Sequence, residues 1–366
     1  MAVSRTIHVR TEAQTRELLV TRVADVEARP IEALWPGLLY RGKLAIIAGD
    51  PGLSKSTLAS AIAATISVGG RWPLSDESAP IGDTLMLAAE DDIADTLRPR
   101  LEEAGADLSR IHCVQGVFDD GADSSGYRTE QYFQLGRHVA ELDRYLRGAA
   151  GRFRLVVIDP ISAYLSGTDA HKNAEVRQAL QPLVHLAQDH DVAVLLVSHL
   201  NKAADTRAMY RISGSIAFTA VARTVLLVSR DPDEPDCRHL VVAKNNVGRD
   251  SGGLRYRVIG RPRPGYPDGI PRIEWLGASD KNVEDLVCAS TPRNISKEAA
   301  IKEASDWLRA FLETGPKKAG EVESAAQATG IAQTRLHTAS TRLGVQKRPS
   351  GLGGPWYWSL LPGNAG

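Results

Sequence analysis

The stretch from Lys43 to Ile66, KLAIIAGDPGLSKSTLASAIAATI, constrains the fold of this chain more than any other part of the sequence. It begins with Leu44 to Ala48, a short apolar run typical of a buried strand. A glycine-rich turn follows, and apolar residues then recur at helical spacing. A strand, a glycine turn and a helix N-terminus in this order form a cradle for phosphate, because the backbone N–H groups and the helix dipole favour negative charge.

The residues of this turn have distinct expected roles. Lys55 is expected to reach the outer phosphates of a nucleotide, and Ser56 to ligate the Mg2+ that bridges them. An ordinary Gly/Pro turn that binds no ligand is the alternative. The predicted ATP-binding residues of the turn are Gly49, Asp50, Pro51, Gly52, Leu53, Ser54, Lys55, Ser56 and Thr57.

One position departs from the phosphate-loop pattern G-x-x-x-x-G-K-[ST], because Ser54 stands where the second glycine is expected. Glycine is used where the backbone must adopt strained angles or approach a ligand closely. A residue with a Cβ in a left-handed conformation costs about 1–2 kcal/mol, which a residue as small as serine tolerates. We therefore expect the serine to affect nucleotide affinity and rate more than the existence of the site.

Apolar runs alternate with helical patterns from the phosphate loop to residue 200, which predicts a parallel sheet covered by helices on both faces. Closely spaced strand patterns follow and predict an antiparallel extension of the same sheet. The expected fold class is therefore α/β. Predicted strands cover residues 44–48, 82–90, 111–117, 154–159, 191–200, 224–229, 239–244, 254–259 and 273–276, and predicted helices cover 93–104, 131–147 and 174–189.

Composition limits the function classes. The 44 basic and 44 acidic residues balance, so overall charge does not indicate a polyanionic partner, and local charge must carry that argument. The three cysteines lie far apart without CxxC spacing, which argues against a zinc site or a disulfide framework. The N-terminal residues contain no apolar leader, and no run approaches the length of a membrane span. A soluble, cytoplasmic protein is expected.

Two acids follow predicted core strands and are candidates for phosphate chemistry. Asp159 ends an apolar strand and is expected to hold Mg2+, although a strand-ending aspartate can simply cap the turn at Pro160. Glu90 ends the strand after the phosphate-loop helix and is expected to orient the attacking water. Asp91 and Asp92 are the competing acids, but we expect them to begin the next helix, where acids favour the N-terminus.

His199 ends the fourth predicted core strand within Ser198 to Lys202. A polar side chain at this place can contact the γ-phosphate and report its loss to the following loop, whereas a histidine without a function is the alternative. The motifs IIAGDPGLSKST, LAAEDD, LVVIDPISAYL, VSHLNK, RISGSIAFTAVAR and LVVAKNNVG occur in this order. Together they resemble the RecA-type hexameric ATPases, and particularly the plasmid and phage replicative helicases of the RepA type.

This resemblance covers residues 30–278 and implies a RecA-like core that uses ATP and Mg2+. It implies that Asp159 is the Walker B acid, Glu90 the catalytic carboxylate and His199 the sensor. Lys244 would then act on the ATP of a neighbouring subunit, with Arg249 as the second candidate. Arg100 is a candidate for stacking on the adenine, with a solvated helix arginine as the alternative.

Two basic regions are candidates for DNA contact. The polar segment 201–215 carries Lys202, Arg207 and Arg211, and in a ring it would project into the central channel, where cations suit single-stranded DNA. A solvated loop is the alternative. The tail resembles a winged helix and has no acid after Glu323. Its candidate DNA-binding residues are Arg335, Arg342, Lys347 and Arg348.

The tail also has an alternative, because winged helices serve as protein-docking modules as well. Trp356 and Trp358 are expected to pack in its small core rather than stack on bases. The expected division is an arm at 1–34, an ATPase domain at 35–278, a linker at 279–295 and a winged-helix domain at 296–366.

The expected function is an ATP-driven DNA motor. The resemblance implies a ring-forming, homo-hexameric helicase or helicase-like ATPase of a plasmid, phage or mobile-element replication system. A DNA-binding regulator that uses ATP as a switch without unwinding is the second hypothesis, and a strand-exchange recombinase is the third.

Overall fold

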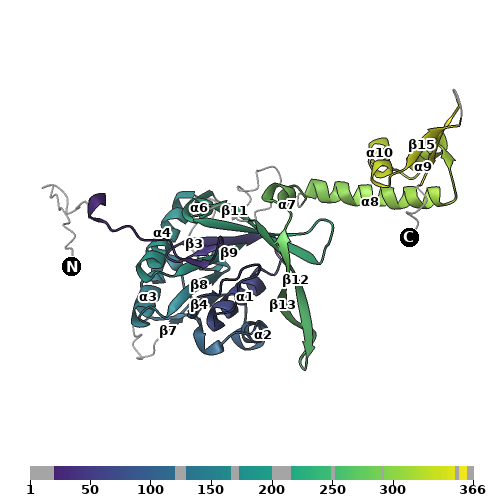
Figure 1. The fold of residues 1–366 in the computed structure, drawn as a ribbon. Helices are drawn as coiled ribbons and strands as arrows, with labels where there is room; N and C mark the ends of the chain where they lie inside the picture. The colour runs from purple at the N-terminus through teal and green to yellow at the C-terminus, as the bar shows by residue number, and fades with distance from the viewer. Residues whose placement is uncertain are drawn as a thin grey trace.

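The computed structural model describes residues 20–119, 129–165, 173–199, 216–248, 252–289, 292–350 and 354–360. Its centre is a nine-stranded sheet in the order β13-β12-β11-β10-β3-β9-β8-β4-β5 (Figure 1). The strands from β10 to β5 in this order are all parallel to their neighbours, and β11, β12 and β13 add antiparallel pairs. The predicted α/β class, with a parallel sheet and an antiparallel extension, is therefore confirmed.

The sheet strands correspond to the apolar runs of the sequence. They are β3 (Leu44–Gly49), β4 (Asp83–Ala88), β5 (Ile111–Cys113), β8 (Phe153–Asp159), β9 (Ala193–His199), β10 (Thr224–Arg230), β11 (Cys237–Asn245), β12 (Gly253–Arg263) and β13 (Tyr266–Ser279). Residues of one strand point alternately to opposite faces. Ala45 and Ile47 of β3 accordingly join one core cluster, whereas Leu44 and Ile46 join another. A strand buried on both faces reads as a continuous apolar run.

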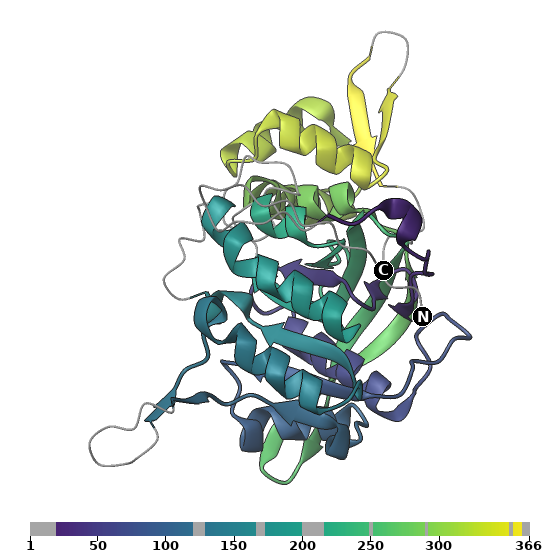
Figure 2. The same ribbon diagram turned by 90° about the vertical axis from the view of Figure 1, so that its left-hand side faces the viewer.

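Helices cover both faces of the sheet (Figures 1 and 2). One face carries α1 (Lys55–Val68) and α2 (Arg98–Glu103), whose apolar residues belong to the first core cluster. The other face carries α3 (Leu135–Gly148), α4 (Asn173–His190) and α6 (Ile216–Val221), which contribute to the second. None of the helices in the described ranges combines the length and the apolar character needed to cross a lipid bilayer.

Three predicted elements differ in detail. The strand expected at 111–117 is divided into β5 and β6 (Val117–Asp119), and the helix expected from Gln131 begins at Leu135. Gln131 instead ends β7 (Thr129–Gln131), which forms an antiparallel hairpin with β6. The helix expected at 93–104 starts as a π-helical turn at Ile93–Leu97 before α2. Residue propensity alone did not predict that Gln131 would pair with β6 instead of beginning a helix.

Short elements complete the main unit. They are η1 (Val23–Asp25), β1 (Ala33–Trp35), β2 (Leu39–Tyr40), η2 (Ile93–Leu97), η3 (Leu108–Arg110) and η4 (Ile161–Tyr164). The strands β1 and β2 pair with each other and bring Trp35 into the first core cluster. There its ring stacks on Trp72, with centroids 4.5 Å apart.

The hairpin of β12 and β13 is longer than the predicted runs at 254–259 and 273–276. Strand β13 contacts α1 and α2, and the outer half of the hairpin projects beyond the rest of the sheet (Figure 1). The Tyr266 hydroxyl donates to the Asp95 carbonyl at 3.1 Å, and Arg263 pairs with Glu103 at 2.7 Å. These two contacts are polar, and residues 260–269 contain no apolar alternation by which the sequence would reveal this half of the hairpin.

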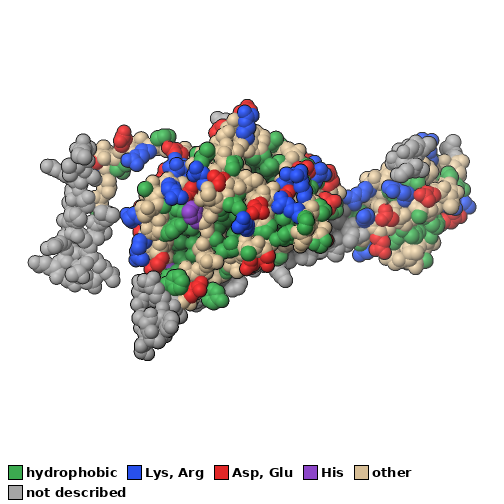
Figure 3. Space-filling view, turned by 90° about the horizontal axis from the view of Figure 1, so that it is seen from below, with side chains coloured by type: hydrophobic (Ala, Val, Ile, Leu, Met, Phe, Trp, Pro, Cys, Tyr) green, Lys and Arg blue, Asp and Glu red, His purple; other side chains and the backbone are tan. Residues whose placement is uncertain are grey.

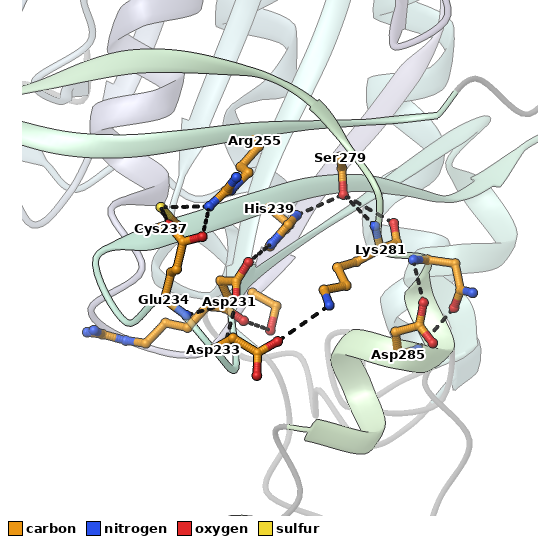
Figure 4. A network of polar contacts seen from close by, with 12 residues as sticks. Asp231, Asp233, Glu234, Cys237, His239, Arg255, Ser279, Lys281 and Asp285 are labelled. Atoms are coloured by element: carbon orange, nitrogen blue, oxygen red, sulfur yellow. Dashed lines mark hydrogen bonds and ion pairs between the residues drawn. The ribbon is translucent and has the colours of Figure 1, made fainter. Parts of the chain in front are cut away.

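A polar network fastens the end of β13 to the turn between β10 and β11 (Figure 4). The fully buried His239 ring bonds to Asp231 through Nε2 at 2.7 Å and to Ser279 through Nδ1 at 2.8 Å. Lys281 adds an ion pair with Asp233 at 3.6 Å. The network therefore determines where the chain leaves the sheet.

After the network comes α7 (Val283–Ala289), in the segment expected to be a linker. Its Leu286 is fully buried against Leu227 of β10 and Val241 of β11. The connector expected to contain one short helical stretch therefore contains α7, which packs on the main sheet.

The C-terminal unit contains α8 (Pro292–Glu313), β14 (Lys317–Lys318), α9 (Ala319–Ala328), α10 (Gln333–Arg342), β15 (Gln346–Pro349) and β16 (Trp356–Ser359). Its strands form a sheet in the order β14-β16-β15. Leu308, Leu336 and Trp358 lie in a separate small core. Figure 3 shows blue basic and red acidic side chains intermixed on the visible face of the main unit, in keeping with the balanced composition.

Candidate functional site

The glycine turn connects β3 to α1 as predicted from the sequence. At Gly49, a Cβ would lie 2.6 Å from the Val228 carbonyl oxygen of β10, so the close approach of this neighbouring strand requires glycine. Gly52 has a φ of 76°, in the left-handed region. Two glycines therefore shape the turn: Gly49 because a neighbouring strand approaches closely, and Gly52 because its φ is positive.

Ser54 also adopts a left-handed conformation, with a φ of 59° and a ψ of 36°, immediately before the first residue of α1. This is the position at which the sequence departs from glycine. The serine keeps the backbone shape of the turn, and the expected cost of about 1–2 kcal/mol applies to it.

Lys55 is the first residue of α1, and its side chain is buried beneath the turn. Its Nζ donates to the carbonyls of Gly49 at 2.9 Å and Asp50 at 2.8 Å, and lies 3.2 Å from His199 Nδ1. Burial lowers the pKa of Lys55, while Asp159, Asp50 and Glu90 oppose this shift. The Lys55 ammonium group therefore contacts both the turn and His199 at the end of β9.

Asp159, at the end of β8, faces the start of α1. Burial raises the pKa of Asp159 to about 6, a hydrogen bond from Ser56 opposes the shift, and Asp91 and Glu90 add to it. Among the residues that the structure describes, the site thus contains more carboxylates than cations. The carboxylates are those of Asp50, Glu90, Asp91 and Asp159, and the cations are Lys55 and Arg100.

This excess of negative charge beside a serine hydroxyl fits a divalent cation such as Mg2+, which prefers oxygen ligands and keeps several waters. In the described part of the chain, no group of three or more His, Cys, Asp or Glu side chains forms a cage for a metal. Ser56 and Asp159 would therefore hold the ion together with water and phosphate oxygens rather than by an all-protein site.

Glu90 lies two residues beyond the end of β4, and its charge acts on Lys55, Asp159 and His199. His199 is exposed at the end of β9. The partial burial of the ring and the charge of Lys55 lower its pKa, whereas Glu90 raises it. The structure therefore brings together Glu90, Asp159, His199 and Lys55 at the carboxyl ends of neighbouring parallel strands.

The two acids after Glu90, Asp91 and Asp92, have different partners. Asp92 caps the following helical turn, because its carboxylate accepts from the N–H groups of Ala94 and Asp95. Asp91 instead forms an ion pair with Arg100 in a partly buried position. The expectation that both acids begin the helix was therefore wrong for Asp91, which the sequence reasoning did not include in the site.

Arg100, predicted to stack on the adenine, is held by this ion pair, and its charge acts on Asp159. Its position is therefore beside the acid cluster, and the role in base stacking stays a prediction. A fully solvated helix arginine, the alternative, does not match the half-buried side chain.

Lys244 lies near the end of β11, and its Nζ donates to the carbonyls of Thr219 at 2.6 Å and Ala222 at 2.9 Å. It therefore caps the C-terminal end of α6 within its own chain. Burial and the charge of Arg223 lower its pKa. Its predicted action in a neighbouring subunit stays a prediction and requires release from these carbonyls. Four predicted residues lie outside the described ranges: Lys202, Arg207, Arg211 and Arg249.

The predicted DNA-binding residues of the tail are spread over α10 and β15. Arg335 and Arg342 on α10 and Arg348 on β15 are exposed. The Lys347 ammonium lies 3.8 Å from the centroid of the Trp358 ring, and burial lowers its pKa. Three of the four cations thus have the exposure that contact with phosphate needs.

The two tryptophans of β16 differ from the expectation that both pack in the core. Trp358 is 6% exposed and belongs to the small core, whereas Trp356 is 53% exposed. Trp356 pairs with Pro349 at the outer end of the β15–β16 hairpin. Its expected burial was therefore wrong.

Two comparisons relate this chain to known proteins. The profile of a family described as AAA domain matches residues 10–205. No curated protein matches the chain. Among solved structures, the chain is similar to one described as an ATPase domain, with a TM-score of 0.44 and 14% identity over 64% of this chain and 86% of that one.

Proposed function

This chain belongs to the AAA domain family, and on that premise we propose that it is an ATPase that acts on DNA as a ring-forming motor. The observation that carries the proposal is the meeting of Lys55, Ser56 and Asp159 at the glycine turn, with Glu90 and His199 from adjacent strand ends. Such a constellation serves phosphoryl transfer, in which positioning and charge stabilisation supply most of the catalysis.

Each residue has a part in this reaction. Lys55 leaves the two turn carbonyls and donates to phosphate oxygens, which are stronger acceptors because they are charged. Mg2+, when bound at Ser56 and Asp159, neutralises the charge that develops on the phosphates. Glu90 orients the attacking water and accepts its proton.

His199 connects hydrolysis to the rest of the molecule. Its Nδ1 is within hydrogen-bond distance of Lys55 Nζ, so the loss of the γ-phosphate changes the partners of both side chains. Residues 200–215 follow His199 directly in the sequence. A change at His199 therefore passes to the segment that carries Lys202, Arg207 and Arg211.

The finer parts of the proposal rest on the sequence. In a ring of identical subunits, a hexamer by resemblance, Lys244 or Arg249 would complete the ATP site of the neighbour. The tail, residues 296–366, would form a winged helix that contacts duplex DNA through Arg335, Arg342 and Arg348. Its three helices and small antiparallel sheet are compatible with this interpretation.

A second function remains in competition, because Ser54 has a strained conformation at the phosphate turn. A protein with slow hydrolysis could use ATP as a switch for DNA binding without unwinding. ATPase activity is measured with and without single-stranded DNA, together with unwinding of a forked duplex. Stimulated hydrolysis with unwinding supports the motor, nucleotide-dependent binding without unwinding supports the switch, and absence of nucleotide binding contradicts both.

A further inference from the structure

A tyrosine from the antiparallel extension contacts the phosphate turn from behind. Tyr256 of β12 is fully buried, and its hydroxyl donates to the Leu53 carbonyl oxygen at 3.3 Å. Leu53 immediately precedes Ser54, and its own side chain is 4% exposed. A residue 203 positions away in the sequence therefore holds one peptide group of the turn.

The held peptide is the one whose orientation matters for phosphate. The bond between Leu53 and Ser54 is a trans peptide. In a planar trans peptide the C=O and N–H groups point in opposite directions. Because Tyr256 holds the Leu53 carbonyl, the Ser54 N–H points away from the tyrosine, on the side where the turn offers N–H groups to an anion.

Serine makes this orientation less secure than glycine would. Rotation of the peptide by half a turn would move the φ of Ser54 from 59° to roughly −120°, to the negative sign of φ that residues with a Cβ prefer. Glycine has no such preference, because it populates both signs of φ about equally. A serine at this position therefore needs an external contact that opposes the rotation.

The tyrosine is itself rigidly held. Its ring packs edge-on against Trp275 at 5.6 Å between centroids, and Trp275 packs edge-on against Trp35 at 5.8 Å. The stack of Trp35 on Trp72 continues the cluster, and Trp72 Nε1 donates to the Leu34 carbonyl at 3.0 Å. Burial also raises the pKa of Tyr256, so its hydroxyl remains a donor at neutral pH.

We propose that Tyr256 is a positioning residue for the phosphate turn: its hydroxyl keeps the Leu53–Ser54 peptide in the orientation that presents the Ser54 N–H to a bound phosphate, and so compensates for serine at the glycine position. The proposal rests on the proposed function in one respect, namely that this turn binds a nucleoside triphosphate. Tyr256 lies on β12, outside the turn, the acid cluster and β9.

The test is a double-mutant cycle of Tyr256→Phe and Ser54→Gly, with the dissociation constant of a fluorescent ATP analogue and Mg2+ as the readout. In the natural background, Tyr256→Phe should weaken binding about three- to tenfold, as loss of one hydrogen bond predicts. Combined with Ser54→Gly, the same change should weaken binding less than about twofold, because glycine does not favour the rotated peptide. In steady state, the KM should rise while kcat stays within about twofold, since the N–H holds phosphate in both ground and transition states.

Tyr40→Phe is the matched control. Tyr40 is also buried, and its hydroxyl has a contact of the same length, 3.3 Å, with Asn245 Nδ2 instead of the turn. It should leave the dissociation constant unchanged. Melting temperatures of all variants identify any loss of folding.

Three outcomes overturn the proposal: no change in affinity for Tyr256→Phe, an equal loss in both backgrounds, or a loss matched by Tyr40→Phe. The proposed function fails separately, if the unmodified protein binds the analogue no better than Lys55→Ala does. Failure of the role of Tyr256 is therefore detected with the Tyr256 and Tyr40 variants, whereas failure of the proposed function is detected by comparing the unmodified protein with Lys55→Ala.

Discussion

Ser54 adopts a left-handed conformation that glycine reaches without strain, and Lys55 beside it is bound to two turn carbonyls and to His199. At this scale, the hydrogen-bond partners of Lys55 explain the position of its side chain. The ammonium of Lys55 lies between the turn and His199, and Asp159 shares a hydrogen bond with Ser56. The chemistry of single residues can therefore be tested by single substitutions.

Replacing Lys55 and Glu90 separates binding from turnover. Lys55→Ala should weaken ATP binding by about 2–3 kcal/mol, the value of a hydrogen bond to a charged group. Glu90→Gln should bind ATP normally and lower kcat about 10²- to 10⁴-fold, because a positioned base is lost. Titration calorimetry and a phosphate-release assay measure the two effects. Asp92→Asn, which preserves the helix cap, is the control and should retain turnover; equal loss of binding in both main variants would exclude Glu90 as the base.

Replacing Ser54 by glycine tests the backbone strain itself. Ser54→Gly should stabilise the folded protein by about 0.5–1 kcal/mol, because relief of the left-handed strain exceeds the entropy that glycine adds to the unfolded chain. Urea unfolding measures the change. Ser78 is exposed and has no positive φ. Ser78→Gly should therefore destabilise the protein slightly, and stabilisation by both variants would contradict the argument.

At the scale of elements, the β12–β13 hairpin connects regions that are distant in the sequence. Its inner half contributes Tyr256 and Trp275 behind the phosphate turn, and its outer half contacts the helices after Glu90. The end of β13 is fastened to the β10–β11 turn by a network centred on His239 (Figure 4). The position of the hairpin therefore depends on a few buried polar contacts.

The carboxylate of Asp231 makes the stability of this network depend on pH. Burial alone would raise its pKa, but hydrogen bonds from His239 and the N–H groups of Asp233 and Glu234 outweigh burial and lower it. A lowered carboxyl pKa contributes stability above the ordinary value of about 3.9, and the contribution is lost as the pH falls through the lowered pKa. Asp231→Asn should therefore reduce the melting temperature at pH 6, and the difference from the unmodified protein should shrink below about pH 4.

Thermal unfolding between these pH values checks the prediction. Asp233→Asn is the control, because its carboxylate is 69% exposed and pairs with Lys281 at the surface. Exposed ion pairs contribute about 0–1 kcal/mol, so this variant should change the melting temperature little at either pH. A constant difference for Asp231→Asn across the range would show that its charge is not what stabilises the network.

At the scale of the whole molecule, assembly and DNA contact would involve surfaces that one chain does not complete. Lys244 is bonded to α6 in its own chain, and the exposed cations of the tail lie on α10 and β15. Predictions at this scale therefore concern mixtures of subunits and binding to long polyanions rather than single sites.

Lys244→Ala tests action between subunits. If Lys244 completes the site of a neighbour, its loss should lower the rate about 10³- to 10⁵-fold, as for other cations supplied in trans. Added to unmodified protein, the variant should reduce ATPase activity more than in proportion to its fraction. A linear dose response would mean that Lys244 serves only its own chain.

The tail cations make a separate prediction. Arg335→Ala and Arg348→Ala together should weaken duplex DNA binding and lower the slope of log affinity against log salt by about 2, one for each lost phosphate contact. Fluorescence anisotropy at several salt concentrations measures the slope, and ATPase activity without DNA should be unchanged. If neither affinity nor slope changes, the tail is better regarded as a protein-docking module.

Local patterns in the sequence were sufficient for the phosphate turn, the strands that end at Asp159 and His199, and the alternation that makes the sheet parallel. These features depend on neighbouring residues, whose spacing and conformational preferences are written along the chain. The carboxyl ends of parallel strands meet at one edge, so the assembly of Glu90, Asp159 and His199 followed from the same pattern.

Other features depended on side-chain contacts that form only in the folded chain. The pairing of Asp91 with Arg100, the capping of α6 by Lys244 and the hold of Tyr256 on Leu53 are side-chain contacts without a periodic signal. The outer half of the β12–β13 hairpin, beyond the predicted runs at 254–259 and 273–276, was missed because residues 260–269 show no apolar alternation. Only the folded sheet order brings β12 behind the phosphate turn, because a contact across 203 positions is determined by packing rather than by local preference.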